Sequence, residues 1–279
     1  MSVIGRFIHR VTPYSRKGDM LIYYMQFIRA HGRLPASRLN FNDYLFQLKT
    51  SKKIDSALLG FISDKELVKL FVRSVVGEEF NVPTLSVLNN EAEVRSYKFQ
   101  PNCVVKPTHA SGEILFTGQD GNADRAKVIS WLQYDYYKRT RERNYRNLEK
   151  KIIVEPLIFG RADNLDYKFH CYEGKVRLLQ VDTDRHVKHT RAFFSRDFER
   201  LPFSIGYPIS HVPIRRPDNL MQMIKVAEGL SSYFPYIRVD MYTDGESVLV
   251  GELTNLHGNA HEPFFPPEAE NKFGAMFFT

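Results

Sequence analysis

The chain has 279 residues, a net charge of +7 and an isoelectric point near 9.2. Its 43% hydrophobic and 25% charged residues exclude a disordered protein, and the length suffices for two or three subdomains. The N-terminus mixes basic and aromatic residues without the apolar run of a signal peptide or membrane span. Two isolated cysteines fit a reduced compartment. We therefore expect a cytoplasmic protein, with contact to the inner face of the membrane left open.

In chain order, residues 1–60 are expected to be helical and irregular. A capping box at residues 63–66 predicts the start of a helix that ends near Gly77. The segment 82–88 follows as a short strand or sheet edge.

Residues 102–116 predict a strand, a turn and a second strand. The apolar run 103–105 ends at Lys106, and residues 107–112 form a loop of small side chains. Such a loop can fold its backbone N–H groups around phosphate oxygens while the lysine neutralises them. Its spacing differs from the Walker A and dinucleotide-binding patterns, so an ordinary hairpin is the alternative.

Seven basic residues lie between positions 138 and 151, at the end of a long polar helix predicted from Ala123 to about Leu148. They are Lys138, Arg139, Arg141, Arg143, Arg146, Lys150 and Lys151. The cluster indicates either a solvated helix face or a surface that attracts a polyanion. No nucleic-acid-binding motif accompanies it, so we expect no nucleic-acid partner.

Strands and helices alternate toward the C-terminus. The apolar run 152–158 carries Glu155, two strands near 167–172 and 175–181 are joined by a turn, and an amphipathic helix covers 218–233. A polar stretch follows the second of these strands. This order favours an α+β fold over a doubly wound sheet.

A hairpin near the C-terminus carries the most informative polar residues. One apolar run ends in Arg238 and Asp240, a tight Asp-Gly turn follows, and the next run ends in Glu252 and Asn255. Two strands joined by a tight turn lie side by side, so these side chains can converge. Carboxylate and amide oxygens suit Mg²⁺, and a guanidinium suits phosphate. The hairpin therefore predicts a metal and phosphate site, with an exposed hairpin of ordinary surface charges as the alternative.

Taken together, these segments resemble the ATP-grasp superfamily, and most closely its TupA-like branch of polysaccharide and teichuronopeptide biosynthesis. The resemblance runs from about Phe41 to Glu268 and rests on the order and spacing of short motifs. They occupy residues 63–65, 106–112, 152–155, 166–169, 180–185, 201–203, 238–240 and 251–254. The resemblance implies an ATP-grasp fold that holds ATP between two α+β subdomains. The expected parts are a helical segment 1–60, a central part 61–100, a lid subdomain 101–160 and a catalytic subdomain 161–279.

The resemblance also implies the residues around the phosphates. Lys106 would contact the α- and β-phosphates, and His109, Ser111 and Gly112 would form a flap over them. Lys168 would reach the triphosphate.

The expected contacts with adenosine lie further along the chain. By resemblance, Glu155 would face the adenine amino group, with the backbone of Leu157 and Ile158 beside the ring. Asp166 would receive the ribose hydroxyls.

For the metal, the resemblance implies Asp240 and Glu252 as Mg²⁺ ligands and Arg238 as the group that steadies the transferred phosphoryl group. Many superfamily ligases place an asparagine two residues after this glutamate, whereas here that position is Thr254 and Asn255 follows it. The third ligand, assigned to Asn255, and the number of metal ions are therefore left open.

The implied activity is that of an ATP-dependent carboxylate–amine ligase acting through an acylphosphate. The basic charge balance favours an acidic sugar, such as a uronic acid, joined to an amino acid or amine in surface polysaccharide biosynthesis. Arg185, His189 and Arg191 would receive a carboxylate substrate or the γ-phosphate. A sugar kinase with the same ATP site and a non-catalytic polyanion-binding domain are the alternatives.

Overall fold

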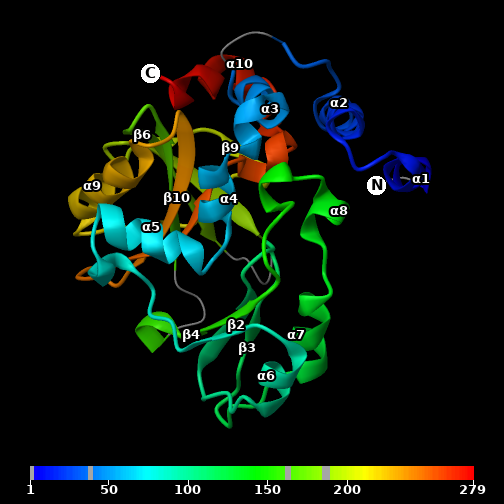
Figure 1. Ribbon diagram of the computed structural model, residues 1–279. Coiled ribbons are helices and arrows are strands. Elements are labelled where there is room, and N and C mark those ends of the chain that lie inside the picture. The colour runs from blue at the N-terminus through cyan, green and yellow to red at the C-terminus, as the bar shows by residue number, and fades with distance from the viewer. Residues whose placement is uncertain (1–2, 37–39, 161–164, 184–188) are drawn as a thin grey trace.

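The computed structural model describes residues 3–36, 40–160, 165–183 and 189–279, and its largest element is a six-stranded antiparallel sheet (Figure 1). The strand order is β11-β10-β5-β6-β7-β8. The strands are β5 (Asp166–Tyr172), β6 (Lys175–Thr183), β7 (Thr190–Ser195), β8 (Arg200–Leu201), β10 (Tyr236–Thr243) and β11 (Val248–Thr254). The β5–β6 and β10–β11 hairpins agree with the sequence prediction, whereas the sequence predicts only a polar stretch where β7 lies.

Two helices, α5 (Leu67–Val75) and α9 (Leu220–Ser231), cover one face of this large sheet (Figure 1). Successive strand residues point to opposite faces, so Phe169, Leu179 and Val239 all reach the core beneath these helices. All three are fully buried. The residues that alternate with them along each strand therefore point to the opposite face of the sheet.

The opposite face is apolar along one half only. There Phe193 and Tyr236 of the sheet pack with Phe41 and Phe277, whose rings stack with centroids 3.7 Å apart. The elements that supply this aromatic cover are α3 (Phe41–Thr50), β9 (Ser204–Ile205), β12 (Phe264–Phe265), α10 (Ala269–Phe273) and η6 (Gly274–Phe277). The other half of this face carries polar side chains.

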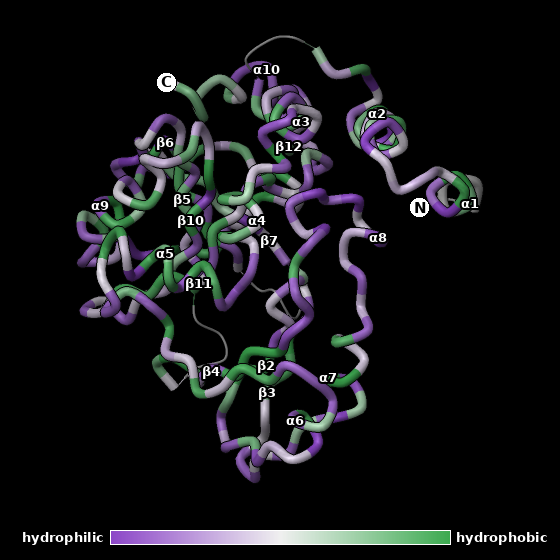
Figure 2. Tube along the Cα trace, viewed as in Figure 1, coloured by the Kyte–Doolittle hydropathy of each residue, from purple (hydrophilic) through white to green (hydrophobic). Residues whose placement is uncertain are grey.

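A second, four-stranded sheet with the order β1-β4-β2-β3 forms a smaller α+β unit. It consists of β1 (Ser86–Leu88), β2 (Cys103–Pro107), β3 (Leu115–Phe116) and β4 (Ile152–Pro156), with α6 (Glu91–Ser96) and α7 (Arg125–Leu132) packed on it. Val105 and Val154 pair across β2 and β4 and share a buried cluster with Trp131 of α7. Figure 2 shows the hydrophobic character of β2 in this unit. The predicted subdomain boundaries stay a prediction.

The N-terminal segment is helical, as the sequence predicts. Its elements are α1 (Val3–Val11), α2 (Arg16–His31), α3, η1 (Lys52–Asp55) and α4 (Ala57–Ser63). Figure 1 shows α1 and α2 at one side of the molecule, far from α9.

Part of the basic cluster at residues 138–151 turns inward to hold these helices. Arg141 is fully buried and pairs with Asp19 of α2 at 3.1 Å. Arg143 pairs with the same aspartate at 2.8 Å and with Asp55 at 2.6 Å. We call Asp19, Arg141 and Arg143 the N-terminal clamp. Its cations are engaged within the protein and are not available to a polyanion.

The long helix predicted from 123 to 148 is instead broken into α7, α8 (Tyr136–Thr140) and η3 (Arg143–Tyr145). The Asp135 side chain accepts a hydrogen bond from the Lys138 N–H and caps a new helix. Arg141 ends that helix with a left-handed φ of 63°. The continuous polar pattern hides both breaks, because a capping aspartate and a charged residue are also common inside polar helices.

The helix start predicted at residues 63–66 is capped differently. Ser63 belongs to the end of α4, where its hydroxyl donates to the Leu59 carbonyl at 2.7 Å. The Asp64 carboxylate accepts the backbone N–H groups of Glu66 and Leu67 at 2.8 and 3.0 Å. The aspartate therefore takes the capping role that the sequence pattern assigns to the serine.

Candidate active site

The polar half of the large sheet carries the predicted hairpin residues. Arg238 and Asp240 of β10 lie opposite Thr254 and Glu252 of β11 in the strand register. Residues two apart on a strand point to the same face, so all four side chains meet there. The structure thus brings together the arginine and the two carboxylates of the predicted site.

Arg238 joins the two carboxylates. Its Nε and Nη2 atoms donate to the two oxygens of Asp240 at 2.6 Å each, a bidentate pair. Nη2 also donates to Glu252 Oε1 at 3.2 Å, and Nη1 lies 2.8 Å from Nδ1 of His257. Burial opposes the charged guanidinium, but Asp240 and Glu252 raise the pKa of Arg238 above its ordinary value.

Glu252 is the more accessible of the two carboxylates, with 37% of its side chain exposed against 3% for Asp240. Burial opposes its ionisation, but the positive charges of Lys65 and Arg238 lower the pKa of Glu252 to about 2. The carboxylate is therefore ionised and open to a cationic ligand at neutral pH.

Lys168 of β5 lies between two carboxylates of the same face. Its ammonium donates to Asp240 Oδ2 at 2.7 Å and also to Asp166. Burial opposes the charged form, but Asp166 and Asp240 raise the pKa of Lys168. Lys168 and Asp166 are both buried. The expected contacts of Lys168 with the triphosphate and of Asp166 with the ribose stay predictions.

The same face continues with polar residues on β6 and β7. The Gln180 amide donates to Asp182 at 2.9 Å, and its oxygen lies 3.1 Å from Nε2 of His170. Arg191 donates through Nε to Asp182 at 2.6 Å and through Nη1 to Glu262 at 2.7 Å.

Glu262 connects this part of the face back to the hairpin. Its Oε2 lies 3.0 Å from Nε2 of His257, which in turn contacts Arg238. We call the connected set the charged network. Its members are Asp166, Lys168, His170, Gln180, Asp182, Arg191, Arg238, Asp240, Glu252, His257 and Glu262. Neither His257 nor Glu262 is assigned to the site from the sequence.

In the small sheet, Lys106 lies against the carboxylate expected at the adenine. Lys106 and Lys69 bind the two oxygens of Glu155 at 2.5 and 2.6 Å. Burial opposes its ionisation, but these lysines lower the pKa of Glu155. Leu157 and Ile158 follow directly after β4 and are half-buried. The nucleotide contacts of these residues stay predictions.

The flap predicted over the phosphates has an exposed tip and a buried base. Ser111 and Gly112 are exposed, and the φ of 83° at Gly112 favours glycine there. His109 is buried, and its Nε2 lies 3.2 Å from the Trp131 carbonyl at the end of α7. The histidine is therefore held at the base of the loop, while the tip is free to meet a ligand.

Lys65 is a site residue for which the resemblance implies no role. Its ammonium donates to the Ala110 carbonyl of the flap. Burial lowers the pKa of Lys65, Glu252 opposes this shift and Lys106 adds to it. Lys65 thus interacts electrostatically with both the small sheet and the hairpin. A lysine directly after the helix-capping Asp64 is the sequence signal that points to it.

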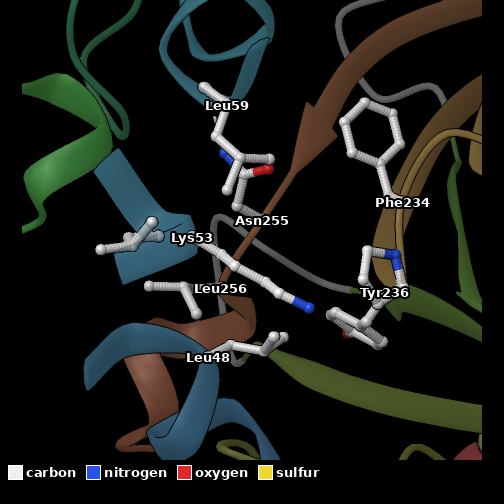
Figure 3. A pocket seen from close by; sticks show the side chains of 9 residues that line it. Leu48, Lys53, Leu59, Phe234, Tyr236, Asn255 and Leu256 are labelled. Carbon is white, nitrogen blue, oxygen red and sulfur yellow. Dashed lines mark hydrogen bonds between the residues drawn. The ribbon is translucent and has the colours of Figure 1, made fainter. Parts of the chain in front are cut away.

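Asn255, the predicted third metal ligand, is turned toward α4. Its amide donates to the Leu59 carbonyl at 3.3 Å and to Ser63 Oγ at 3.0 Å. Figure 3 shows it beside Leu59 at a mainly apolar cavity of about 40 Å³, which Lys53 and Tyr236 also line. This cavity is too small for a nucleotide or a sugar, and the metal role of Asn255 stays a prediction.

The three predicted substrate-facing residues differ in their surroundings. His189 stacks on Tyr207 with ring centroids 3.7 Å apart and lies 3.6 Å from Asp182 Oδ1. Arg191 is buried in the charged network, with its guanidinium bound to carboxylates of the protein itself. Arg185 lies outside the described residues. Their contact with a substrate stays a prediction.

The donor set fits Mg²⁺ in chemical type. Asp240 and Glu252 present hard oxygen atoms from paired strands, and Mg²⁺ bound together with phosphates typically uses one or two carboxylates. Within the described residues, no group of three His, Cys, Asp or Glu side chains could hold a metal ion. A metal at this hairpin would therefore take phosphate oxygens and water as its remaining ligands.

Two α+β units, one with Lys106 on the strand before a glycine-containing loop and the other with an arginine–carboxylate hairpin, are the arrangement expected of an ATP-grasp protein. A sequence model of the TupA-like ATP-grasp family matches residues 46–278, which is most of the chain. The protein therefore belongs to the TupA-like ATP-grasp family, and both the resemblance and the α+β ATP-grasp fold are confirmed.

Several solved structures of ligases are similar to this chain. The L-amino acid ligase of Bacillus licheniformis has a TM-score of 0.49 and 12% identity, covering 94% of this chain and 60% of that one. The D-alanine–D-alanine ligase of Bacillus anthracis has a TM-score of 0.44 and 16% identity, covering 80% and 67%. The ATP-grasp ligase PsnB with its minimal precursor has a TM-score of 0.42 and 14% identity, covering 72% and 54%. This chain thus spans about half to two thirds of their lengths. No curated protein matches its sequence.

Proposed function

We propose that the protein is an ATP-dependent carboxylate–amine ligase that acts through an acylphosphate. The observation that carries this proposal is Arg238 bound to Asp240 and Glu252, with Lys168 on the neighbouring strand. This arrangement combines the groups that phosphoryl transfer needs, namely carboxylates for a metal ion and fixed cations for the phosphoryl oxygens.

The reaction has two steps. In the first, a carboxylate oxygen of the acceptor attacks the γ-phosphorus of ATP, the bond to the β–γ bridging oxygen breaks and ADP leaves. In the second, an amine nitrogen attacks the acyl carbon, phosphate leaves with the electron pair of the C–O bond, and the nitrogen loses a proton. The first step makes a poor electrophile reactive and needs no nucleophile from the protein.

The side chains of this chain bind and neutralise the reacting groups. Lys65 and Lys106 would meet the triphosphate from the side of the flap, and Arg238 would offset charge on the transferred group. Asp240 and Glu252 would hold Mg²⁺, which when bound neutralises the phosphate oxygens. Because Arg238, Asp240 and Glu252 are held by the charged network before the substrate arrives, little reorganisation of these three groups is needed in the transition state.

The proposed acceptor is an acidic sugar or polysaccharide, joined to an amino acid or amine in the biosynthesis of a surface polysaccharide. The resemblance to the TupA-like family supports a negatively charged acceptor. The proposed location is the cytoplasm. None of the described helices has the length and hydrophobicity to cross a bilayer.

A sugar kinase remains the second candidate, because the same site could transfer the phosphoryl group to a hydroxyl. Hydroxylamine separates the two reactions. It converts an acylphosphate into a hydroxamate and leaves a sugar phosphate unchanged.

The proposal is tested by measuring ADP release with Mg²⁺, a panel of uronic acids and the twenty amino acids, followed by mass spectrometry of the products. We expect ADP release that depends on both substrates and a product with the mass of an amide. The Glu252→Gln variant is the inactive reference, and Glu246→Gln, an exposed residue of the hairpin turn, is its matched control. An amide formed at the same rate by Glu252→Gln would contradict the assignment of the site. Calorimetry that detects no Mg²⁺-dependent ATP binding would favour the non-catalytic alternative.

A further inference from the structure

The N-terminal segment holds most of the net positive charge of the protein. Residues 1–40 contain seven Lys or Arg residues and one acidic residue, so six of the seven net charges lie in these forty positions. The acidic residue is Asp19, which is fully buried in the N-terminal clamp. The surface of the described part of this segment therefore presents cations without acidic neighbours from its own helices.

The same segment exposes an unusual share of large apolar side chains. Of the sixteen such side chains among the described residues, seven lie here, although the segment is a small part of the chain. They are Phe7, Val11, Tyr14, Leu21, Tyr24, Ile28 and Leu34, with 39 to 65% exposure. Exposed apolar groups gathered in this way indicate an interaction surface.

On α2 these residues form a regular stripe. Lys17, Leu21, Tyr24 and Ile28 follow at intervals of four, three and four residues, which places them on one side of the helix. Phe27 and its buried neighbours occupy the other side and pack into the protein. The helix therefore carries apolar side chains on two sides. The inner side packs into the protein, whereas on the outer side the Tyr24 ring meets the edge of Phe46 with centroids 4.9 Å apart and Leu21 and Ile28 are exposed.

Three cations accompany this stripe. Arg10 of α1 and Lys17 and Arg29 of α2 are exposed, and none forms an ion pair with a described residue. By contrast, Arg16 pairs with Asp55, and Arg33 pairs with carboxylates of the protein body. The unpaired cations thus lie on the same helices as the exposed apolar residues.

The N-terminal clamp fixes the orientation of this surface. The Arg141 guanidinium donates to the carbonyl oxygens of His9, Thr12 and Pro13 at 2.7 to 2.9 Å, at the corner between α1 and α2. The corner between the two helices is therefore fixed to the protein, and the buried residues of α2 keep its outer side turned away from it. Figure 1 shows both helices at the edge of the molecule, with α9 at the opposite edge.

We propose that this N-terminal face, formed by the exposed residues of α1 and α2, docks on an anionic lipid bilayer. Aliphatic and tyrosine side chains suit the boundary between head groups and acyl chains, and adjacent cations are attracted to anionic head groups. A second copy of the chain is a poor occupant, because an isologous contact would oppose Arg10, Lys17 and Arg29 to the same cations. The inference concerns where the protein acts and does not depend on the proposed reaction.

Vesicle flotation tests the proposal with the full chain. We expect the protein to float with vesicles of phosphatidylglycerol and phosphatidylcholine at low salt. We expect it to stay unbound with phosphatidylcholine alone, and to bind less at high salt. Leu21→Glu should lower vesicle binding about tenfold or more, because it removes apolar area that would be buried in the bilayer and adds a charge that anionic head groups repel. Met221→Glu on α9 is the matched control, since its side chain is 62% exposed against 53% for Leu21. It should bind as the unmodified protein does.

Unmodified protein that does not float with anionic vesicles would overturn the proposal, and so would equal flotation of Leu21→Glu. Circular dichroism and the melting temperature show whether Leu21→Glu is folded. If it is not, the double variant Lys17→Glu with Arg29→Glu carries the same expectation of lost binding. ADP release without vesicles is measured for each variant. Loss of vesicle binding with unchanged ADP release separates this inference from the proposed reaction.

Discussion

Leu179 and Gln180 are neighbours on β6, yet their side chains enter opposite environments. Leu179 is fully buried in the apolar cluster beneath α9, and Gln180 is equally buried among the polar groups of the charged network. On the first face, stability follows from the apolar area removed from water. On the second, each charge must find a partner, and buried ion pairs add little net stability over apolar residues. The charged face is therefore better explained by what it can bind than by what it adds to folding.

The largest effect should come from the charged face and appear in the rate. Asp240→Asn removes a metal-binding carboxylate and a partner of Arg238, and we expect ADP release to fall by about 10²- to 10³-fold. The steady-state rate with saturating Mg²⁺ and substrates checks this. Glu246→Gln in the same hairpin should keep the full rate. A fully active Asp240→Asn protein would show that the charged face is not needed for the reaction.

The apolar face should respond in stability and not in chemistry. Leu179→Ala leaves a cavity in the core beneath α9, and we expect it to lower the free energy of unfolding by about 3 kcal/mol. Urea denaturation measures this loss. ADP release per folded molecule should stay near that of the unmodified protein. A large loss of rate at unchanged stability would contradict this expectation.

A smaller effect is expected at the small sheet. Lys106→Met should weaken ATP binding by about 2 kcal/mol, because a hydrogen bond to a charged group typically contributes this much. Calorimetric titration with ATP and Mg²⁺ measures this change. Lys98→Met serves as the control, because Lys98 is exposed on the same unit. Equal ATP affinity of the two variants would show that Lys106 serves only to neutralise Glu155.

The smallest effect concerns acid stability. The pKa of Glu252 is held near 2 in the folded protein, below its ordinary value of 4.5. Its ionised form therefore stabilises the folded protein at pH values above 4.5. This contribution is lost as pH falls from about 4.5 toward 2. We expect Glu252→Gln to melt below the unmodified protein at pH 6 and the difference to shrink across this range. Glu246→Gln should show no such trend, and a constant difference would argue against the shifted pKa.

Much of this architecture was accessible from local patterns. The hairpin of Arg238 and Glu252 is predictable because alternate apolar residues and an Asp-Gly turn fix both the strands and their shared face. The helix α9 is predictable for the same reason, since its apolar residues recur at helical spacing.

The remainder of the site depends on contacts between distant segments. His257 and Glu262 join the charged network from the segment that follows β11, and no local pattern relates them to Arg191. Lys65 reaches the flap only because α5 starts beside it. In the same way, Arg141 is read as a solvated cation until Asp19, far earlier in the chain, is placed beside it.

The double hold on Asp240 has a consequence for the order in which ligands can enter. Arg238 and Lys168 neutralise the Asp240 carboxylate when no ligand is bound, which reduces its repulsion with neighbouring carboxylates. A free metal ion would have to compete with both of these cations for the same oxygens. A nucleotide that arrives with its metal supplies negative oxygens to which the two cations can turn. The site is therefore expected to take up the metal and the nucleotide together and to bind the bare metal weakly.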